Sequence, residues 1–339
     1  MLQDGQGGSS NKVLDYVASI PDTLEYKGEF GAELILFLPF VNWLSRTGLL
    51  GSRRIITYRG MKCFYDDLKA LEVVEQSGVR VARQPKNRLP CLPAKDEHTL
   101  GRFGPCAFHI YPDLRRKFAA LPLQSRVAAS DRPLLVIHNK FNSEWNSGPI
   151  NFIDPATLET IFSTLKHQFQ IIYIRHGAGQ RNVAYSQDVD GQMDLGDLEV
   201  LERHHEVLSF DALFAEHVAG GGQDDINTFK NKIYSRCFYF LSVQGGGCHH
   251  IAYFRGSLMV ILHKRGHESK YAYSEGYYNF LANPAPIRAI CADSDELMRA
   301  AALFTESCVI GDRVHLSDKA RQIIRPFLPK VNMTGKKIV

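Results

Sequence analysis

The chain has 339 residues, of which 45% are hydrophobic and 22% are charged. These proportions are typical of a folded globular protein and exclude a disordered or fibrous one. The 40 basic and 36 acidic residues give a net charge of +4, too small and too dispersed to predict a nucleic-acid partner, although it suits an anionic small ligand. The length exceeds what one core usually fills, so we expect two domains.

Cysteine usage and the apolar stretches point to a cytoplasmic protein without a membrane span. The seven cysteines include no CxxC pair, which argues against a disulfide framework or a zinc knuckle. Residues 1–20 lack a basic segment followed by an apolar one, so we interpret them as a mobile leader. The most apolar stretch, Ala32 to Leu44, is too short to cross a bilayer.

The first half of the sequence predicts strands that alternate with helices. In chain order the expected elements are a strand before a turn at Gly28–Gly31, a helix that ends near Gly48, a strand at 52–60, a helix at 66–78, a loop over 83–105, and a strand and a helix within 106–122.

The second half repeats this alternation after a predicted linker at Ala128–Pro133. We expect a strand at 133–139, a helix begun by Asp154, a strand at 170–177, an irregular acidic region at 186–199, a strand at 204–210, a helix at 224–236, a strand at 238–244, a helix from Cys248, a strand at 257–264, a strand and a helix within 286–304 and a helix at 317–328. Such alternation predicts parallel sheets with helices on both faces.

The predicted fold is therefore α/β, with two Rossmann-like domains that face a cleft. The expected division is a leader (1–20), an N-terminal domain (21–130), a C-terminal domain (131–310) and a terminal helix with a tail (311–339). Ligands of open parallel sheets bind beyond the carboxyl ends of the strands, so the turns at those ends are the places to search for a site.

A glycine triplet, Gly245, Gly246 and Gly247, stands between a predicted strand and a predicted helix. Residues without a Cβ atom let an anion approach the main chain and the positive end of the following helix, where His249 can add a donor. The alternative is that the triplet forms a tight turn and nothing more. Neither GxGxxG nor GxxxxGK[ST] is present, so we expect no NAD, FAD or P-loop nucleotide site and no cofactor.

Three segments resemble glycosyltransferases of the GT-B fold. GEFGAE (Gly28 to Glu33) is similar to the glycine-rich openings of fucosyltransferases and heptosyltransferases. YIRHG (Tyr173 to Gly177) is similar to the strand-end arginine segment of fucosyltransferases, and Ser242 to Leu262 resembles the HGAGLTN-type segment of β-xylosyl- and N-acetylglucosaminyltransferases. The resemblance implies a nucleotide-sugar donor in the second half and a glycan or glycoconjugate acceptor in the first.

Glycosyl transfer needs donors aimed at a departing diphosphate and a base for the acceptor hydroxyl. We expect Arg175, at a strand end, to bind the diphosphate, although it can equally be a surface arginine. The base candidates are Glu29 and Glu33, of which Glu33 also suits a helix start. The other residues predicted to bind the donor are Gln244, Gly245, Gly246, Gly247, His249 and His138, the last of which can instead be a hydrogen-bonded core histidine.

We expect no metal in this chemistry. Asp188 with Asp190, and Asp293 with Asp295, have DxD spacing, but neither pair ends an apolar strand, and Asp293 suits a helix cap. The sequence thus predicts a metal-independent glycosyltransferase, and the resemblance suggests an inverting one. Two alternatives stay open: a nucleotide-sugar epimerase with the same fold, and a sugar- or nucleotide-binding protein without catalysis.

Overall fold

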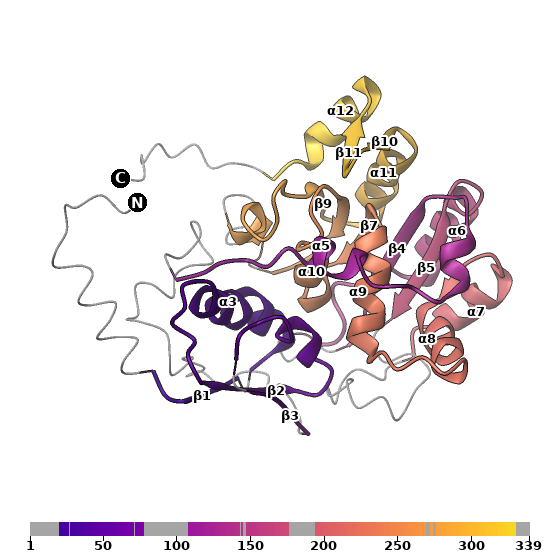
Figure 1. Cartoon of the computed structure of the whole chain (residues 1–339). Helices are drawn as coiled ribbons and strands as arrows, with labels where there is room; N and C mark the ends of the chain where they lie inside the picture. Colours follow the sequence, from indigo (N-terminus) through magenta and orange to yellow (C-terminus); the bar gives the residue numbers. More distant parts are fainter. Residues whose placement is uncertain are drawn as a thin grey trace, which may run out of the picture.

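The structure, a computed structural model, describes residues 20–26, 28–70, 72–77, 108–142, 144, 147–175, 194–266, 268, 272–273 and 276–329. The predicted α/β class is confirmed in this part of the chain. It contains a three-stranded parallel sheet, a six-stranded parallel sheet and an antiparallel pair, β10 (Ser307–Ile310) with β11 (Arg313–Leu316) (Figure 1). Below, the first half means the described residues up to 130, and the second half means those from 131 onward.

The first half carries the smaller sheet, in the order β1 (Thr23–Glu25), β2 (Arg54–Tyr58) and β3 (Glu72–Gln76). Between β1 and β2 the chain forms α2 (Phe30–Ala32), a π-helical turn η1 (Glu33–Phe37) and α3 (Leu38–Arg46), and η2 (Lys62–Phe64) follows β2. The helix predicted at 66–78 is wrong, since this segment contains β3. Val73 and Val74 pair with Ile55 and Ile56 of β2, an arrangement that suits β-branched side chains.

The end of the first half packs onto the second. The predicted helix within 106–122 is α5 (Leu114–Ala119), but the strand expected before it is not found between residues 108 and 113; η3 (Arg126–Ala129) follows. Arg115 of α5 is buried and its guanidinium donates to the carbonyl oxygens of Ser235 at 2.7 Å, Cys237 at 2.8 Å and Arg255 at 2.9 Å. Arg115 therefore joins the two halves.

The six-stranded sheet has the order β6-β5-β4-β7-β8-β9, with every pair parallel. This is the order of a doubly wound dinucleotide-binding sheet, in which the direction of strand addition reverses between the first and fourth strands of the unit. Here the reversal lies between β4 and β7. The strands are β4 (Leu134–Asn139), β5 (Gln170–Arg175), β6 (Leu208–Ser209), β7 (Tyr239–Val243), β8 (Leu258–Leu262) and β9 (Ile287–Cys291).

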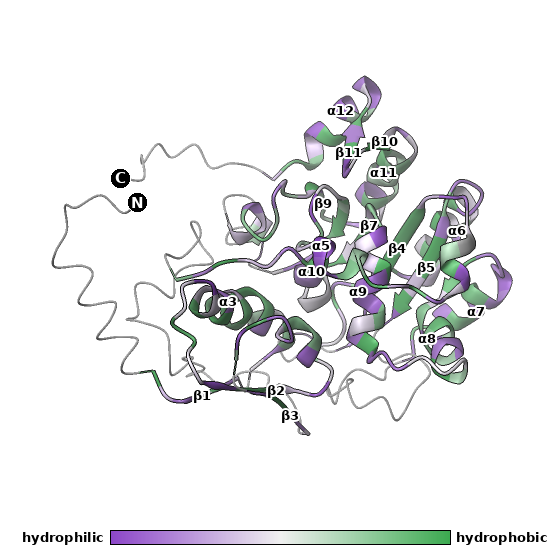
Figure 2. Cartoon of the chain, in the orientation of Figure 1, coloured by the Kyte–Doolittle hydropathy of each residue, from purple (hydrophilic) through white to green (hydrophobic). Residues whose placement is uncertain are grey.

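Helices cover both faces of this sheet because alternate strand residues point to opposite sides. Leu135 and Ile137 belong to the core shared with α6 (Pro155–Leu165), α7 (Asp197–Arg203), α11 (Ser294–Thr305) and α12 (Asp318–Ile324). Val136 belongs to the core shared with α8 (Phe210–Ala219), α9 (Ile226–Arg236) and α10 (Gly246–Ile251). The strands are hydrophobic along most of their length (Figure 2). Short 3-10 turns, η5 (Tyr277–Asn279) and η6 (Arg325–Phe327), complete the described elements.

The two halves share one core. A continuous cluster of buried side chains runs from Phe37 and Phe40 of the first half to Phe240 of β7. A hydrogen bond also links the two halves, because the amide Nδ2 of Asn227 in α9 donates to the carbonyl oxygen of Gly60 at 2.7 Å. In the described part of the chain, no helix has both the length and the apolar character needed to cross a membrane.

Candidate functional site

The candidate site lies at the carboxyl ends of β4 and β7, where the strand order reverses. At such a point the two following loops leave the sheet on opposite faces, which opens space for a ligand. Lys140 follows β4 directly and Gln244 follows β7 directly. The ammonium Nζ of Lys140 lies 3.4 Å from the amide Oε1 of Gln244, so the two loops meet.

At each position of the glycine triplet, a side chain would be unfavourable for a different steric reason. Gly245 caps α10 with φ 134° and ψ −167°, a conformation that side chains rarely adopt. A Cβ atom on Gly247 would overlap the His138 imidazole, and one on Gly246 would lie 3.3 Å from the Phe30 ring. The helix predicted from Cys248 begins two residues earlier, at Gly246.

The two glycine turns of the sequence meet in space. A Cβ atom on Gly31 would lie 3.2 Å from the Cα of Gly246 and 2.8 Å from Cδ2 of His249. Gly245, Gly246 and Gly247 are nevertheless only half-buried. The first N–H groups of a helix have no partners within the helix, so this turn presents donors beside the first half of the chain.

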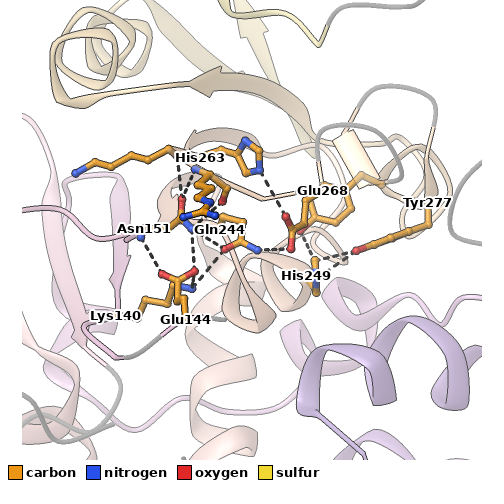
Figure 3. A network of polar contacts seen from close by, with 11 residues as sticks. Lys140, Glu144, Asn151, Gln244, His249, His263, Glu268 and Tyr277 are labelled. Carbon is orange, nitrogen blue, oxygen red and sulfur yellow. Dashed lines mark hydrogen bonds and ion pairs between the residues drawn. The ribbon is translucent and has the colours of Figure 1, made fainter. Parts of the chain in front are cut away.

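Lys140 belongs to a buried polar network that joins the loops after β4, β7 and β8 (Figure 3). Lys140 Nζ forms an ion pair with Oε2 of Glu144 at 3.1 Å. The Glu144 carboxylate also accepts hydrogen bonds from Asn151, at 2.8 Å from its backbone N–H and at 2.8 Å from its side-chain Nδ2. Both residues are buried, with exposed fractions of 8% for Glu144 and 0% for Asn151.

The network continues through Gln244 to Glu268. The Nε2 of Gln244 donates to the Glu268 carboxylate, and His263 Nε2 lies 3.5 Å from the other oxygen of that carboxylate. Burial alone would raise the pKa of Glu268, but hydrogen bonds from His263 and the backbone, the positive charge that His249 acquires in acid, and the Gln244 amide together lower it to about 2. Glu268 is therefore an anion at neutral pH.

His249 lies between two tyrosines and the first half. Its Nδ1 is 2.6 Å from the Tyr278 hydroxyl, and both ring nitrogens are 3.2 Å from the Tyr277 hydroxyl. Burial lowers the pKa of His249 to about 4, so the ring is neutral at pH 7. A neutral imidazole can donate one hydrogen bond and accept another, which matches the two tyrosine hydroxyls beside it.

Arg175 is buried at the end of β5 and forms an ion pair with Asp197. Its Nε lies 2.7 Å from Oδ2 of Asp197, which is fully buried and also accepts a hydrogen bond from the Tyr173 hydroxyl at 2.6 Å. The alternative interpretation of Arg175 as a surface arginine is therefore wrong. Its predicted role as a diphosphate ligand stays a prediction, with Asp197 as a competing partner.

The two candidate bases occupy different surroundings. Glu29 precedes α2 and is exposed, next to Phe30, which contacts the glycine triplet. Glu33 is fully buried, and its Oε1 accepts hydrogen bonds from the Thr57 hydroxyl and, at 3.0 Å, from the Tyr65 hydroxyl. The structure thus corrects the expected position of Glu33, which lies inside the core of the first half and not at a cleft.

Within the described ranges, no group of three or more His, Cys, Asp or Glu side chains could hold a metal ion. Asp293 caps α11 by accepting from the Glu296 N–H at 2.8 Å, as its position in the sequence indicates. Asp188, Asp190 and His176 lie outside the described residues.

Sequence reasoning finds part of this site and misses part. It identifies His138, Gln244, the glycines and His249, which the structure brings together. It misses Lys140, Glu144, Asn151, His263 and Glu268. Of these, Lys140 had a usable signal, because it directly follows a predicted strand end.

No protein-family model and no curated protein matches the sequence. Among solved structures, the fold is similar to a glycosyl transferase of family 9 from Veillonella parvula. The similarity covers 86% of this chain and 90% of that one, at 10% sequence identity and a TM-score of 0.43. A likeness at this level concerns the course of the chain and not its function.

Proposed function

We propose that this protein is a glycosyltransferase that moves a sugar from a nucleotide-diphosphate donor to a hydroxyl group of a glycan or other acceptor, without a metal ion and with inversion. The observation that carries the proposal is the meeting of Lys140, the half-buried triplet Gly245–Gly247 and the first-half turn at Gly31, at the point where the strand order reverses. This arrangement offers one cation and several N–H donors to a diphosphate and lies beside a second surface that can hold an acceptor.

The electrostatics of the site fit a departing diphosphate. As the glycosidic bond breaks, negative charge grows on the leaving group, and donors fixed in advance stabilise it without reorganisation. Lys140 is held in place by Glu144 and Gln244, and the start of α10 adds backbone N–H groups. Gln244, His249 and His138 complete the proposed donor-binding set, and Arg175 is a further candidate.

For the acceptor we propose Glu29 as the general base. It is exposed, whereas Glu33 is enclosed by Thr57 and Tyr65. A base must reach the proton that it removes, and only Glu29 of the two is open to solvent. Glu29 also adjoins Phe30, so it lies close to the proposed position of the donor.

A thermal-shift screen tests donor binding. GDP, UDP, CDP and ADP and their sugars are compared with and without a chelator, because a ligand of the folded state raises the melting temperature. We expect at least one nucleotide diphosphate to stabilise the protein in both conditions. If none does, the proposal fails, and if the chelator abolishes the shift, metal independence fails.

Variants of the two carboxylates then test catalysis. With the donor from the screen and a panel of sugar acceptors, Glu29→Gln should retain nucleotide binding while transfer falls about a hundredfold or more. Glu33→Gln serves as the matched comparison and should chiefly lower stability, because it disturbs a buried hydrogen-bond acceptor. Epimerised donor in the absence of any acceptor would favour an epimerase, and binding without turnover of any donor would favour a non-catalytic protein.

A further inference from the structure

Asn151 is fully buried and contacts all three loops of the polar network. It lies in the loop between β4 and α6. Its Oδ1 accepts from the backbone N–H groups of Lys264 at 2.8 Å and Arg265 at 3.2 Å, both in the loop after β8. Its Nδ2 lies 2.8 Å from Glu144 Oε2, 2.9 Å from the Arg265 carbonyl oxygen and 3.2 Å from Gln244 Oε1.

These partners fix the orientation of the amide. Two N–H donors face Oδ1, and acceptors face Nδ2, so a flipped amide would place like groups against each other on both sides. The Nδ2 group has only two N–H bonds for its three acceptors, so one N–H must be shared. The contact with Gln244 is the longest of the three, and we assign the shared hydrogen bond to it. Both polar atoms of the side chain therefore connect loops, and Nδ2 also donates to Glu144 within the loop of Asn151 itself.

From these contacts we infer that Asn151 is a positioning residue that sets the places of Gln244 and Lys140, and thereby the affinity for the donor diphosphate. It acts on Gln244 directly and on Lys140 through Glu144, whose carboxylate it orients with two hydrogen bonds. The inference rests on the proposed function for the identity of the ligand. The geometric part, which is the holding of three loops together, does not depend on any ligand.

Asn151→Asp separates the two sides of the amide. A carboxylate oxygen still accepts from the N–H groups of Lys264 and Arg265, but it cannot donate to Glu144 or Gln244 and brings a like charge to Glu144. Asn151→Ala removes both sides. Asn42→Asp is the matched control, because Asn42 is also buried and donates to a carbonyl oxygen, that of Ile110 at 2.7 Å, within the first half.

The first measurement is the binding of the nucleotide diphosphate that stabilises the wild type most. The affinity is calculated for the folded fraction of each variant and compared with that of the wild type. We expect it to fall at least tenfold in Asn151→Asp and Asn151→Ala and to stay within about twofold in Asn42→Asp. A buried asparagine with a purely structural role would lower melting temperature in all three variants and leave the affinity of folded protein unchanged. Wild-type affinity in both Asn151 variants would overturn the inference.

The second measurement needs no ligand and keeps the two proposals distinguishable. Hydrogen exchange of the backbone amides of Lys264 and Arg265 should accelerate at least tenfold in Asn151→Ala and stay close to wild type in Asn151→Asp. If the wild type binds no nucleotide, the proposed function fails, and exchange alone decides whether Asn151 holds the loops. Unchanged hydrogen exchange in Asn151→Ala would show that Asn151 does not hold the loops together.

Discussion

Gly31 of the first half packs against Gly246 of the second, so that a Cβ atom on either would lie within 3.6 Å of the Cα of the other. The contact is tight on the Gly31 side, where a Cβ atom would lie 3.2 Å from the Gly246 Cα, whereas 3.6 Å on the Gly246 side is an ordinary van der Waals distance. Gly31 lies in α2, which follows β1, and Gly246 begins α10, which follows β7, so each glycine lies beyond the carboxyl end of a strand of a parallel sheet. The contact therefore brings together the positions where ligands of both sheets would be expected.

Replacement of Gly31 by alanine should loosen this contact. The added Cβ would lie 2.8 Å from Cδ2 of His249, whose ring is held by two tyrosine hydroxyls and cannot move aside freely. We expect a loss of about 1–3 kcal/mol in the free energy of unfolding, measured by chemical denaturation. Gly148→Ala is the control, because nothing lies within 4 Å of its Cβ position. Equal stability of the two variants would show that the halves do not pack as described.

Gly247 and His138 should be energetically coupled. Gly247→Ala places a methyl group in the His138 ring and should destabilise the fold, even though alanine favours helices. His138→Ala removes the ring, so the double variant should lose about 1–3 kcal/mol less than the sum of the single losses. Exposed His205 supplies the comparison, since Gly247→Ala and His205→Ala should be additive. Additivity in the His138 cycle would contradict the contact.

The fold follows largely from sequence periodicity, and the helix predicted at 66–78 shows where periodicity fails. The buried apolar runs of β4, β5, β7 and β8 are fully enclosed and therefore read clearly as strands. In the segment Glu72–Gln76, EVVEQ, the two valines are adjacent and do not alternate with polar residues. Because the residues before this segment have helical spacing, the sequence predicts one helix over both and misses the short strand. Pairing with β2, which depends on distant residues, decides its structure.

The site was predictable only where it has a local pattern. Gly245–Gly247 stand out because three glycines between a strand and a helix form such a pattern. Asn151 and Glu268 are single polar residues without a motif, and the Gln244 that each of them contacts lies far away in the sequence. Arg175 was predicted at a strand end correctly, but its burial against Asp197 depends on a helix that follows much later. Contacts of this kind come from the fold and not from local sequence.

Lys140 and Arg175 should respond differently to removal of their charge. Arg175→Met leaves the fully buried Asp197 without that cation, and we expect a loss of about 3–5 kcal/mol in the free energy of unfolding. Lys140→Met leaves the buried Glu144 carboxylate without its cation and should also lower stability, by less than Arg175→Met because Lys140 is nearer to solvent, and it should lower the affinity for the nucleotide diphosphate at least tenfold. Denaturation and calorimetric titration measure the two effects. Weakened binding at normal stability in Arg175→Met would instead make the arginine a phosphate ligand.

Acid should destabilise the protein in two steps. The pKa of His249 is lowered from 6.5 to about 4 by burial, so the unfolded chain takes up this proton first and stability falls as the pH drops from about 6.5 to 4. The corresponding loss is about 3 kcal/mol at most. The pKa of Glu268 is lowered to about 2, so its contribution is present above about 4.5 and is lost between that pH and 2.

Substitution of His249 by glutamine tests the first step. Stability measured by denaturation at each pH should fall less steeply between 6.5 and 4 in His249→Gln than in the wild type. The slope should not vanish, because burial also lowers the pKa of His250 well below its ordinary value. That histidine therefore also makes the protein less stable as the pH falls. His167→Gln, at an exposed position, should keep the wild-type slope. An identical slope in His249→Gln and the wild type would mean that the imidazole is not held neutral between Tyr277 and Tyr278.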